Sequence, residues 1–303
     1  MKHSRLALKI VLINLFFCQC SLAWNPFSIF SKKANENVIQ KEFPLAQKGS
    51  VSIKNIWGDI IVKKWKQEMV QIKITKSTTK PEFSEQVSIK IRASEKQIII
   101  ETKETKEAAG KVEVKIELLV PEKTKINAIT KKGSIKIEDL HAEAKARTQN
   151  GNIEIANVQG TIITSSDYGN IKICNSCKDI RAHTLNGNIT IDQATKNIVA
   201  RTKKGTICTT CKNAYSLDTI SLSTKSGNIV LELPEQINAE VLAKTKKGKI
   251  TSEHFITMKP QTTQLNKKTW ARMRKEVDGT LGNGDASIKL TAGSGNIKIN
   301  KIA

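Results

Sequence analysis

Residues 148–173, TQNGNIEIANVQGTIITSSDYGNIKI, contain the tripeptide GNI twice, at glycines that are eighteen residues apart. The same interval separates five glycines in succession, which are Gly133, Gly151, Gly169, Gly187 and Gly205. A fixed period of this length indicates a structural repeat, in which each unit folds in the same way and stacks on the next. The fold therefore depends on what one eighteen-residue unit contains.

Each unit has two stretches with a period of two, one before and one after its glycine. Isoleucine stands two residues after the glycine in all five units and four residues after it in four of them, where the fifth has Thr209. Before the glycine, apolar or small residues stand at the seventh, fifth and third positions, as in Ile162, Thr164 and Ser166. A period of two places alternate side chains on one face of a strand. Each unit is therefore predicted to be a strand, a turn at glycine and a second strand.

One such unit cannot bury its apolar face alone, but stacked units can. We therefore predict an all-β fold, a β-solenoid or β-helix-like stack of eighteen-residue coils. Glycine suits the turn because it adopts positive φ without steric cost. Asn152, Asn170 and Asn188 share one position in three successive coils and predict a hydrogen-bonded ladder. The predicted turn glycines are Gly133, Gly151, Gly169, Gly187, Gly205, Gly227, Gly248 and Gly295.

A left-handed β-helix of hexapeptide repeats is disfavoured, because it needs an apolar residue at every sixth position. Residues 126–303 form the predicted solenoid, and residues 253–284 interrupt it as an inserted basic loop. Within that loop, KKTWARMRKEV is either a short basic helix or a loop that covers the core with Trp270. Residues 49–125 alternate without the glycine frame and predict an N-terminal antiparallel β region that continues the sheet or caps the stack. Residues 24–48 are predicted to be a linker.

The first residues have the features of a secretory signal peptide. Lys2 and Arg5 are followed by a short apolar run over 10–20 and by small residues at 21–23. A membrane anchor is the alternative, but the run is short for a membrane span. We predict a signal peptide over 1–23 and an exported protein in the periplasm, at the cell surface or outside the cell.

The order of the motifs resembles that of the bacterial putative-adhesin domain, a β-repeat family of poorly defined function. The resemblance rests on SVSIKNIWGDIIVKKW at 50–65, VKIELLVPEKTKINAITKKGSIKI at 114–137, the repeated T-x-x-G-x-I-x-I units and GTLGNGDASIKLTAGSGNIKI at 279–299. It covers roughly residues 45–303. The resemblance implies a β-solenoid-like fold in the cell envelope and brings no catalytic residues with it.

The chain is strongly basic, with 50 Lys and Arg against 28 Asp and Glu and a net charge of +22. This excess is also what an AT-rich genome would produce. The tetrapeptide TKKG recurs, however, and places lysine pairs along the predicted glycine edge; the six candidate anion-binding residues are Lys131, Lys132, Lys203, Lys204, Lys246 and Lys247. They predict a site for anionic envelope polymers or lipid phosphates, or else a charged edge that prevents aggregation. Nucleic acid is disfavoured, because export and an aromatic content of only 4% argue against it.

Four cysteines follow the signal peptide as two C-x-x-C pairs, Cys174 with Cys177 and Cys208 with Cys211. The pairs differ in phase and lie two coils apart, roughly 10 Å at the spacing of β-strands. In an exported protein we favour a local disulfide within each pair, with a shared zinc ion and free thiols as the alternatives. We expect no metal site and no cofactor.

No arrangement of residues indicates catalysis. The three histidines after the signal peptide are His141, His183 and His254, and they stand at different phases of the coil. Glu138, Glu154 and Asp192 are scattered in phase as well. We therefore expect no catalytic residues and a protein that is not an enzyme.

Three hypotheses of function follow. The first is a non-enzymatic binding or adhesive module at the bacterial cell envelope, whose partner is an envelope polymer, an anionic lipid surface or another protein. The second is a structural protein that self-associates through its end coils, because the chain finishes on a regular repeat strand, INKIA. The third is a carbohydrate-active enzyme on a β-helix, which would need two carboxylates facing one groove.

Overall fold

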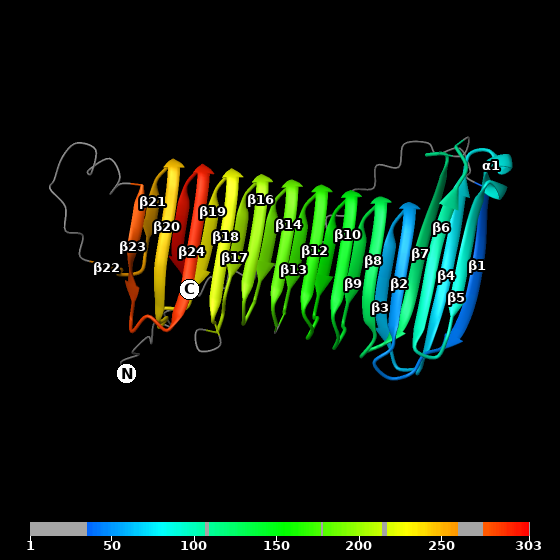
Figure 1. Cartoon of the computed structure of the whole chain (residues 1–303), viewed down its shortest axis with the longest axis horizontal. Coiled ribbons are helices and arrows are strands. Elements are labelled where there is room, and N and C mark those ends of the chain that lie inside the picture. The colour runs from blue at the N-terminus through cyan, green and yellow to red at the C-terminus, as the bar shows by residue number, and fades with distance from the viewer. Residues whose placement is uncertain (1–34, 107–108, 177, 214–216, 260–274, 303) are drawn as a thin grey trace, which may run out of the picture. The chain divides into compact units, whose positions relative to one another are not determined.

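The computed structural model of the protein describes residues 35–106, 109–176, 178–213, 217–259 and 275–302, all within one unit, Ala34–Ala303. These residues form two sheets of stacked strands (Figure 1) and one short helix, α1 (Pro81–Glu85). No helix among them is long and apolar enough to cross a membrane. The predicted signal peptide over 1–23 lies outside the described residues.

The first sheet, called sheet A below, has twelve strands among the described residues. In spatial order they are β1 (Asn35–Pro44), β4 (Met69–Thr78), β7 (Val112–Pro121), β3 (Ile60–Trp65), β9 (Ile135–Glu138), β11 (Ile153–Ala156), β13 (Ile171–Cys174), β15 (Ile189–Asp192), β17 (Ile207–Thr210), β19 (Ile229–Leu233), β25 (Ile297–Lys301) and β21 (Ile250–Ser252).

The second sheet, called sheet B below, has thirteen strands in the same part of the chain. In spatial order they are β22 (Thr257–Met258), β23 (Glu276–Leu281), β20 (Ala239–Lys247), β24 (Ala286–Ser294), β18 (Thr219–Ser226), β16 (Ile198–Lys204), β14 (Ile180–Asn186), β12 (Ile162–Tyr168), β10 (Ala144–Asn150), β8 (Lys125–Lys132), β2 (Ser50–Trp57), β6 (Gln97–Glu104) and β5 (Val87–Ala93).

Each coil is a strand of sheet B, a glycine turn and a strand of sheet A, so the predicted β-solenoid is confirmed. Successive coils pair in parallel and in register, so that Ile153 faces Ile171 and Ile171 faces Ile189. The residues that alternate inward are almost fully buried; Ile155 and Ile173, for example, are 0% exposed. The core is thus a row of aligned isoleucine, alanine and threonine side chains between the two sheets.

The glycine turn leaves no room for a side chain. Gly205 has a φ of 151°, and a Cβ atom built on it would collide with the carbonyl oxygen of Gly187 in the preceding coil. That carbonyl accepts a hydrogen bond of 3.0 Å from the hydroxyl of Thr202, three residues before the turn. The threonine or serine at this position therefore links each coil to the turn of its neighbour.

The predicted asparagine ladder forms, with backbone donors. The backbone N–H of Asn188 donates to Oδ1 of Asn170 at 2.8 Å, and that of Asn170 donates to Oδ1 of Asn152 at 2.8 Å. A second ladder, which the sequence analysis missed, joins the side chains of Asp139, Asn157 and Asn175 at the opposite turns, with bonds of 2.8 and 2.9 Å.

The order of the last coils differs from their order in the sequence. β24 and β25 lie between the coil of β18 and β19 and the coil of β20 and β21. The parallel register confirms this, since Ile297 faces both Ile229 and Ile250. The hypothesis that the C-terminal strand is an open end is therefore wrong, because β25 has a partner on each side.

Both flanking regions end in antiparallel strands. Residues 49–125 continue both sheets and cap the stack, but the prediction of an antiparallel region is only partly correct. β4 is antiparallel to β1 and β7, and β5 to β6, whereas β2 pairs in parallel with β6 and β8, and β3 with β7 and β9. The linker predicted over 24–48 is wrong from Asn35 onward, because all ten residues of β1 pair with β4.

The basic loop predicted over 253–284 is wrong at Glu276–Leu281, where β23 pairs antiparallel with β20. Trp270 lies outside the described residues.

Candidate anion-binding surface

All six predicted lysines are exposed on the glycine edge, but they do not form one cluster. Four register steps separate Lys132 from Lys204, which is roughly 19 Å at the usual strand spacing. Three further steps separate Lys204 from Lys247. Lys225, which is also exposed, lies between Lys204 and Lys247 along this edge and precedes its own turn glycine by two residues. The structure thus groups the second and third predicted pairs with Lys225 and leaves the first pair apart.

The first lysine pair has a local contact of its own. The Nζ atom of Lys132 lies 5.0 Å from the centroid of the Trp57 ring. An ammonium group over an aromatic ring at this distance is a cation–π interaction. The pair Lys131 and Lys132 therefore borders the N-terminal region, and the ammonium group of Lys132 already interacts with the ring of Trp57.

The outward face of sheet B carries arginines that the sequence analysis missed. All four arginines among the described residues stand on strands of sheet B, and Arg147, Arg181 and Arg201 lie exposed in its central coils. None of these three forms an ion pair with a described residue, whereas Arg92 pairs with Glu101 at 2.9 Å. The sequence does indicate that these side chains face outward, because residues between the buried positions of a strand must point away from the core.

The arginines are aligned by the parallel register. Arg147, Ser165, His183 and Arg201 occupy one position in four successive coils of sheet B. Arg181 stands in the adjacent column, beside Ile163 and Val199. Arg181, His183 and Arg201 line a shallow hollow of about 400 Å³ together with Ile163, Ser165 and Val199, while Arg147 stands farther along the stack. We call Arg147, Arg181, His183 and Arg201 the basic face.

The opposite side of the same coils differs in charge. The outward positions of sheet A in this stretch include Glu154, Asp192 and Glu232. Glu232 accepts a hydrogen bond from the hydroxyl of Thr210 at 2.8 Å. Lys136 and Lys172 share the column of Glu154, however, so the outward side of sheet A carries charges of both signs, whereas the described arginines stand on sheet B.

The disulfide predicted between Cys208 and Cys211 is not formed, and both are free thiols in the structure. The strand alternation explains this, because Cys208 is half-buried on the outward side and Cys211 is 0% exposed on the inward side. Burial raises the pKa of Cys211 to about 12, which keeps that thiol protonated and unreactive. The bridge between Cys174 and Cys177 stays a prediction, because Cys177 lies outside the described residues.

The histidines and carboxylates weighed for catalysis lie in separate places. Nδ1 of His141 lies 2.7 Å from Glu122, His254 contacts the backbone oxygen of Asn300 at 3.2 Å, and His183 belongs to the basic face. Partial burial raises the pKa of Glu138, but hydrogen bonds and charges from two lysines outweigh it and leave that pKa below its ordinary value. Those lysines are Lys136 at 2.8 Å and Lys63 at 3.3 Å. Among the described residues, no group of three or more His, Cys, Asp and Glu is placed to hold a metal ion.

Comparison with known proteins gives one match of sequence and several of structure. The sequence profile of the Toastrack DUF4097 family matches residues 30–300. No curated protein matches the chain. Similar solved structures include a putative adhesin from Bacteroides fragilis NCTC 9343, at 13% identity over 88% of this chain and 97% of that one, with a TM-score of 0.48.

Two further solved structures have lower TM-scores. A putative lipid binding protein from Parabacteroides distasonis ATCC 8503 is 11% identical over 89% of this chain and 98% of that one, with a TM-score of 0.42. A putative cell adhesion protein from Clostridium sporogenes ATCC 15579 is 13% identical over 89% of this chain and 100% of that one, with a TM-score of 0.31.

Proposed function

This chain belongs to the Toastrack DUF4097 family of β-repeat proteins, and from that premise we propose that it is a non-enzymatic binding module of the bacterial cell envelope that holds acidic polymers on its basic face. The observation that carries the proposal is the presence of Arg147, Arg181 and Arg201 in two adjacent columns of one exposed face, without an ion pair to a described residue.

Arginine is suited to this role. Its planar guanidinium group donates two parallel hydrogen bonds to a carboxylate or phosphate, and it is more weakly hydrated than an ammonium group. Exposed arginines without partners keep these donors available to a ligand. The register places Arg147 and Arg201 three coils apart, roughly 14 Å at the usual strand spacing. A flat array of this kind suits an extended polymer that lies across the strands and makes several weak contacts at once.

The lysines extend the positive potential beyond the basic face. Lys203 follows Arg201 by two residues on β16, and Lys225 and Lys246 occupy the same edge farther along the stack. Summed surface charge of one sign raises the local concentration of an oppositely charged partner and speeds its encounter. Anionic lipid headgroups would respond to the same charges, so an experiment has to separate a polymer from a membrane surface.

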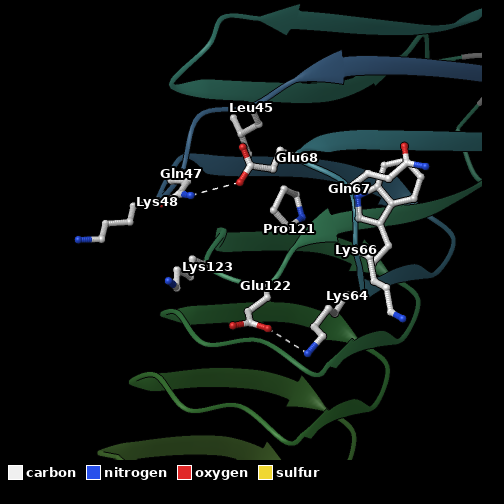
Figure 2. A pocket seen from close by; sticks show the side chains of 11 residues that line it. Leu45, Gln47, Lys48, Lys64, Lys66, Gln67, Glu68, Pro121, Glu122 and Lys123 are labelled. Atoms are coloured by element: carbon white, nitrogen blue, oxygen red, sulfur yellow. Dashed lines mark hydrogen bonds and ion pairs between the residues drawn. The ribbon is translucent and has the colours of Figure 1, made fainter.

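Catalysis on a bound polysaccharide is the competing function, and one pocket does hold two carboxylates. Glu68 and Glu122 line the same pocket (Figure 2). A glycosidase needs an acid whose pKa is raised. The hydrogen bond from Lys64, assisted by the nearby charge of His141, instead holds the pKa of Glu122 below its ordinary value, against the opposing effect of desolvation. This argument favours binding over hydrolysis.

The test is binding of the purified protein to polygalacturonate, to neutral dextran and to vesicles of phosphatidylglycerol, each at low and high salt. We expect polygalacturonate to bind saturably and to lose affinity as salt screens the charges. The variant R147Q/R181Q/R201Q should bind at least about tenfold more weakly, a loss of about 1.4 kcal/mol. Dextran should not bind.

The matched control removes the same charge elsewhere. Lys41, Lys90 and Lys96 are exposed and form no ion pair with a described residue, so K41Q/K90Q/K96Q changes the net charge without touching the basic face. An equal loss in both triple variants would reduce the effect to net charge and contradict the proposal. Stronger binding to vesicles than to polygalacturonate would replace the polymer with a membrane surface.

A further inference from the structure

Three turns of the N-terminal region meet at a pocket that is separate from the basic face. Residues 45–48 follow β1, residues 64–68 join β3 to β4, and residues 121–123 join β7 to β8. The register brings two of these turns together, because Trp65 at the end of β3 faces Pro121 at the end of β7. The pocket between the turns has a volume of about 390 Å³ (Figure 2).

The apolar part of the pocket is rigid. The indole N–H of Trp65 donates a hydrogen bond of 2.6 Å to the backbone oxygen of Met69, which fixes the half-buried ring. Pro121 lies next to it in the sheet, and buried Leu45 contributes a third apolar side chain. A held aromatic ring presents a flat apolar surface at little entropic cost on binding.

The two carboxylates of the pocket already have partners. Glu122 accepts hydrogen bonds from Lys64 at 3.0 Å and contacts His141 at 2.7 Å, and Glu68 accepts one from the side chain of Gln47 at 3.2 Å. Figure 2 shows the bonds from Lys64 to Glu122 and from Gln47 to Glu68. Both carboxylates therefore already interact with other side chains of the protein.

Three lysines of the pocket have no such partner. Lys48, Lys66 and Lys123 are exposed, and none of them forms an ion pair with a described residue. In Figure 2, Lys48 and Lys123 lie on one side of Pro121 and Lys66 lies on the other. The pocket therefore combines a fixed apolar surface, unpaired ammonium groups and the side-chain amide of Gln67.

We propose that this pocket binds one six-membered sugar ring that carries an anionic group, a carboxylate or a phosphate. The apolar face of the ring packs on Trp65 and Pro121, the anion contacts Lys48 and Lys123 on one side of Pro121, and the ring hydroxyls exchange hydrogen bonds with the amide of Gln67 on the other side. The volume lies within the usual range for small-molecule sites, which are mostly apolar with a few convergent polar groups. The proposal does not rest on the basic face, which lies on other strands.

The experiment follows the indole N–H signal of Trp65 by NMR, assigned with W65F, while galacturonic acid, glucose 6-phosphate, galactose and inorganic phosphate are added in turn. We expect the two acidic sugars to shift this signal saturably and galactose to bind at least about tenfold more weakly. The stronger of the two acidic sugars identifies the anionic group. Inorganic phosphate should leave the Trp65 signal in place.

Two surface variants provide the test of the lysines and the control. K48Q/K123Q changes only exposed side chains, so it should keep the fold and lower the affinity for the acidic sugars to that for galactose. R147Q/R181Q/R201Q should bind these sugars unchanged, which separates this site from the polymer-binding proposal. The inference is overturned if galactose binds as well as the acids, if phosphate alone shifts the indole signal equally, or if K48Q/K123Q binds the acidic sugars normally.

Discussion

Two threonines of one coil show how a single hydroxyl group acts in this stack. Thr202 and Thr209 are both buried, at 5% and 1% exposure. The hydroxyl of Thr202 donates to the carbonyl oxygen of Gly187, whereas that of Thr209 has no hydrogen-bond partner among the described residues. Thr209 also stands where the four preceding coils have isoleucine. A satisfied hydroxyl links neighbouring coils, while an unsatisfied one carries a desolvation cost.

Substitution by valine should therefore change stability in opposite directions at these two positions. T202V removes the partner of a turn carbonyl and should lower the free energy of unfolding by about 1–2 kcal/mol. T209V removes an unsatisfied hydroxyl in nearly the same volume and should raise it by about 1 kcal/mol. Urea unfolding followed by circular dichroism would measure both changes. A loss of stability in both variants would contradict the assignment of Thr209 as unsatisfied.

At the residue scale, the sequence predicts a position correctly where its periodicity alone decides whether the residue faces the core or forms a turn. The inward isoleucines and the turn glycines follow from the period of two and the repeat of eighteen. The arginines of the basic face were missed, because outward positions carry no common residue that a repeat would reveal. The linking role of Thr202 was missed because threonine suits a strand with or without a hydroxyl partner.

At the level of strands and coils, the sequence predicts what each unit is but not which unit is its neighbour. The units around Gly227, Gly248 and Gly295 have the same frame, so any of them can stack on another. The long insertion before β24 allows the chain to return, and the structure places β24 and β25 inside the stack. The strand β1 was missed for a related reason, since NENVIQKEFP forms its pairs only with the distant strand β4.

The internal position of the last coil predicts the effect of its removal. If the chain ends after Asp285, β20 loses its parallel partner β24 and β21 loses its partner β25. We expect residues 239–252 to become sensitive to limited proteolysis, while residues 126–210 stay resistant because each of their coils keeps both neighbours. Truncation after Ile302 keeps every paired residue of β25 and is the control, which should leave residues 239–252 resistant. Resistance of 239–252 in the shorter chain would instead mean that this coil stacks directly on β18 and β19 once β24 and β25 are absent.

The unit as a whole combines a repetitive centre with two different ends. In the central coils the arginines stand on sheet B, whereas the outward side of sheet A carries lysines and carboxylates together, so a polyanion meets the arginines on one side of the stack only. At the N-terminal end, β1 pairs with β4 over ten residues and β4 pairs with β7 over eight. At the other end, β21 has three residues, none of them fully buried, and within the described part of the chain it pairs only with β25.

This asymmetry predicts where the stack opens first. In a repeat protein, stability is a sum of contributions from each unit and from its contacts with its neighbours, so a coil with one short partner should open at the lowest free energy. Native-state hydrogen exchange should therefore show the highest protection in β12 and β14, nearly equal protection in β4 and β7, and the lowest in β21 and β22. The variant T209V should raise protection in the central coils and leave β21 unchanged, because β17 and β21 are not neighbours in sheet A.

Uniform protection along the stack would instead mean that the coils open as one cooperative unit, and faster exchange in β4 than in β21 would mean that the antiparallel strands do not cap the stack.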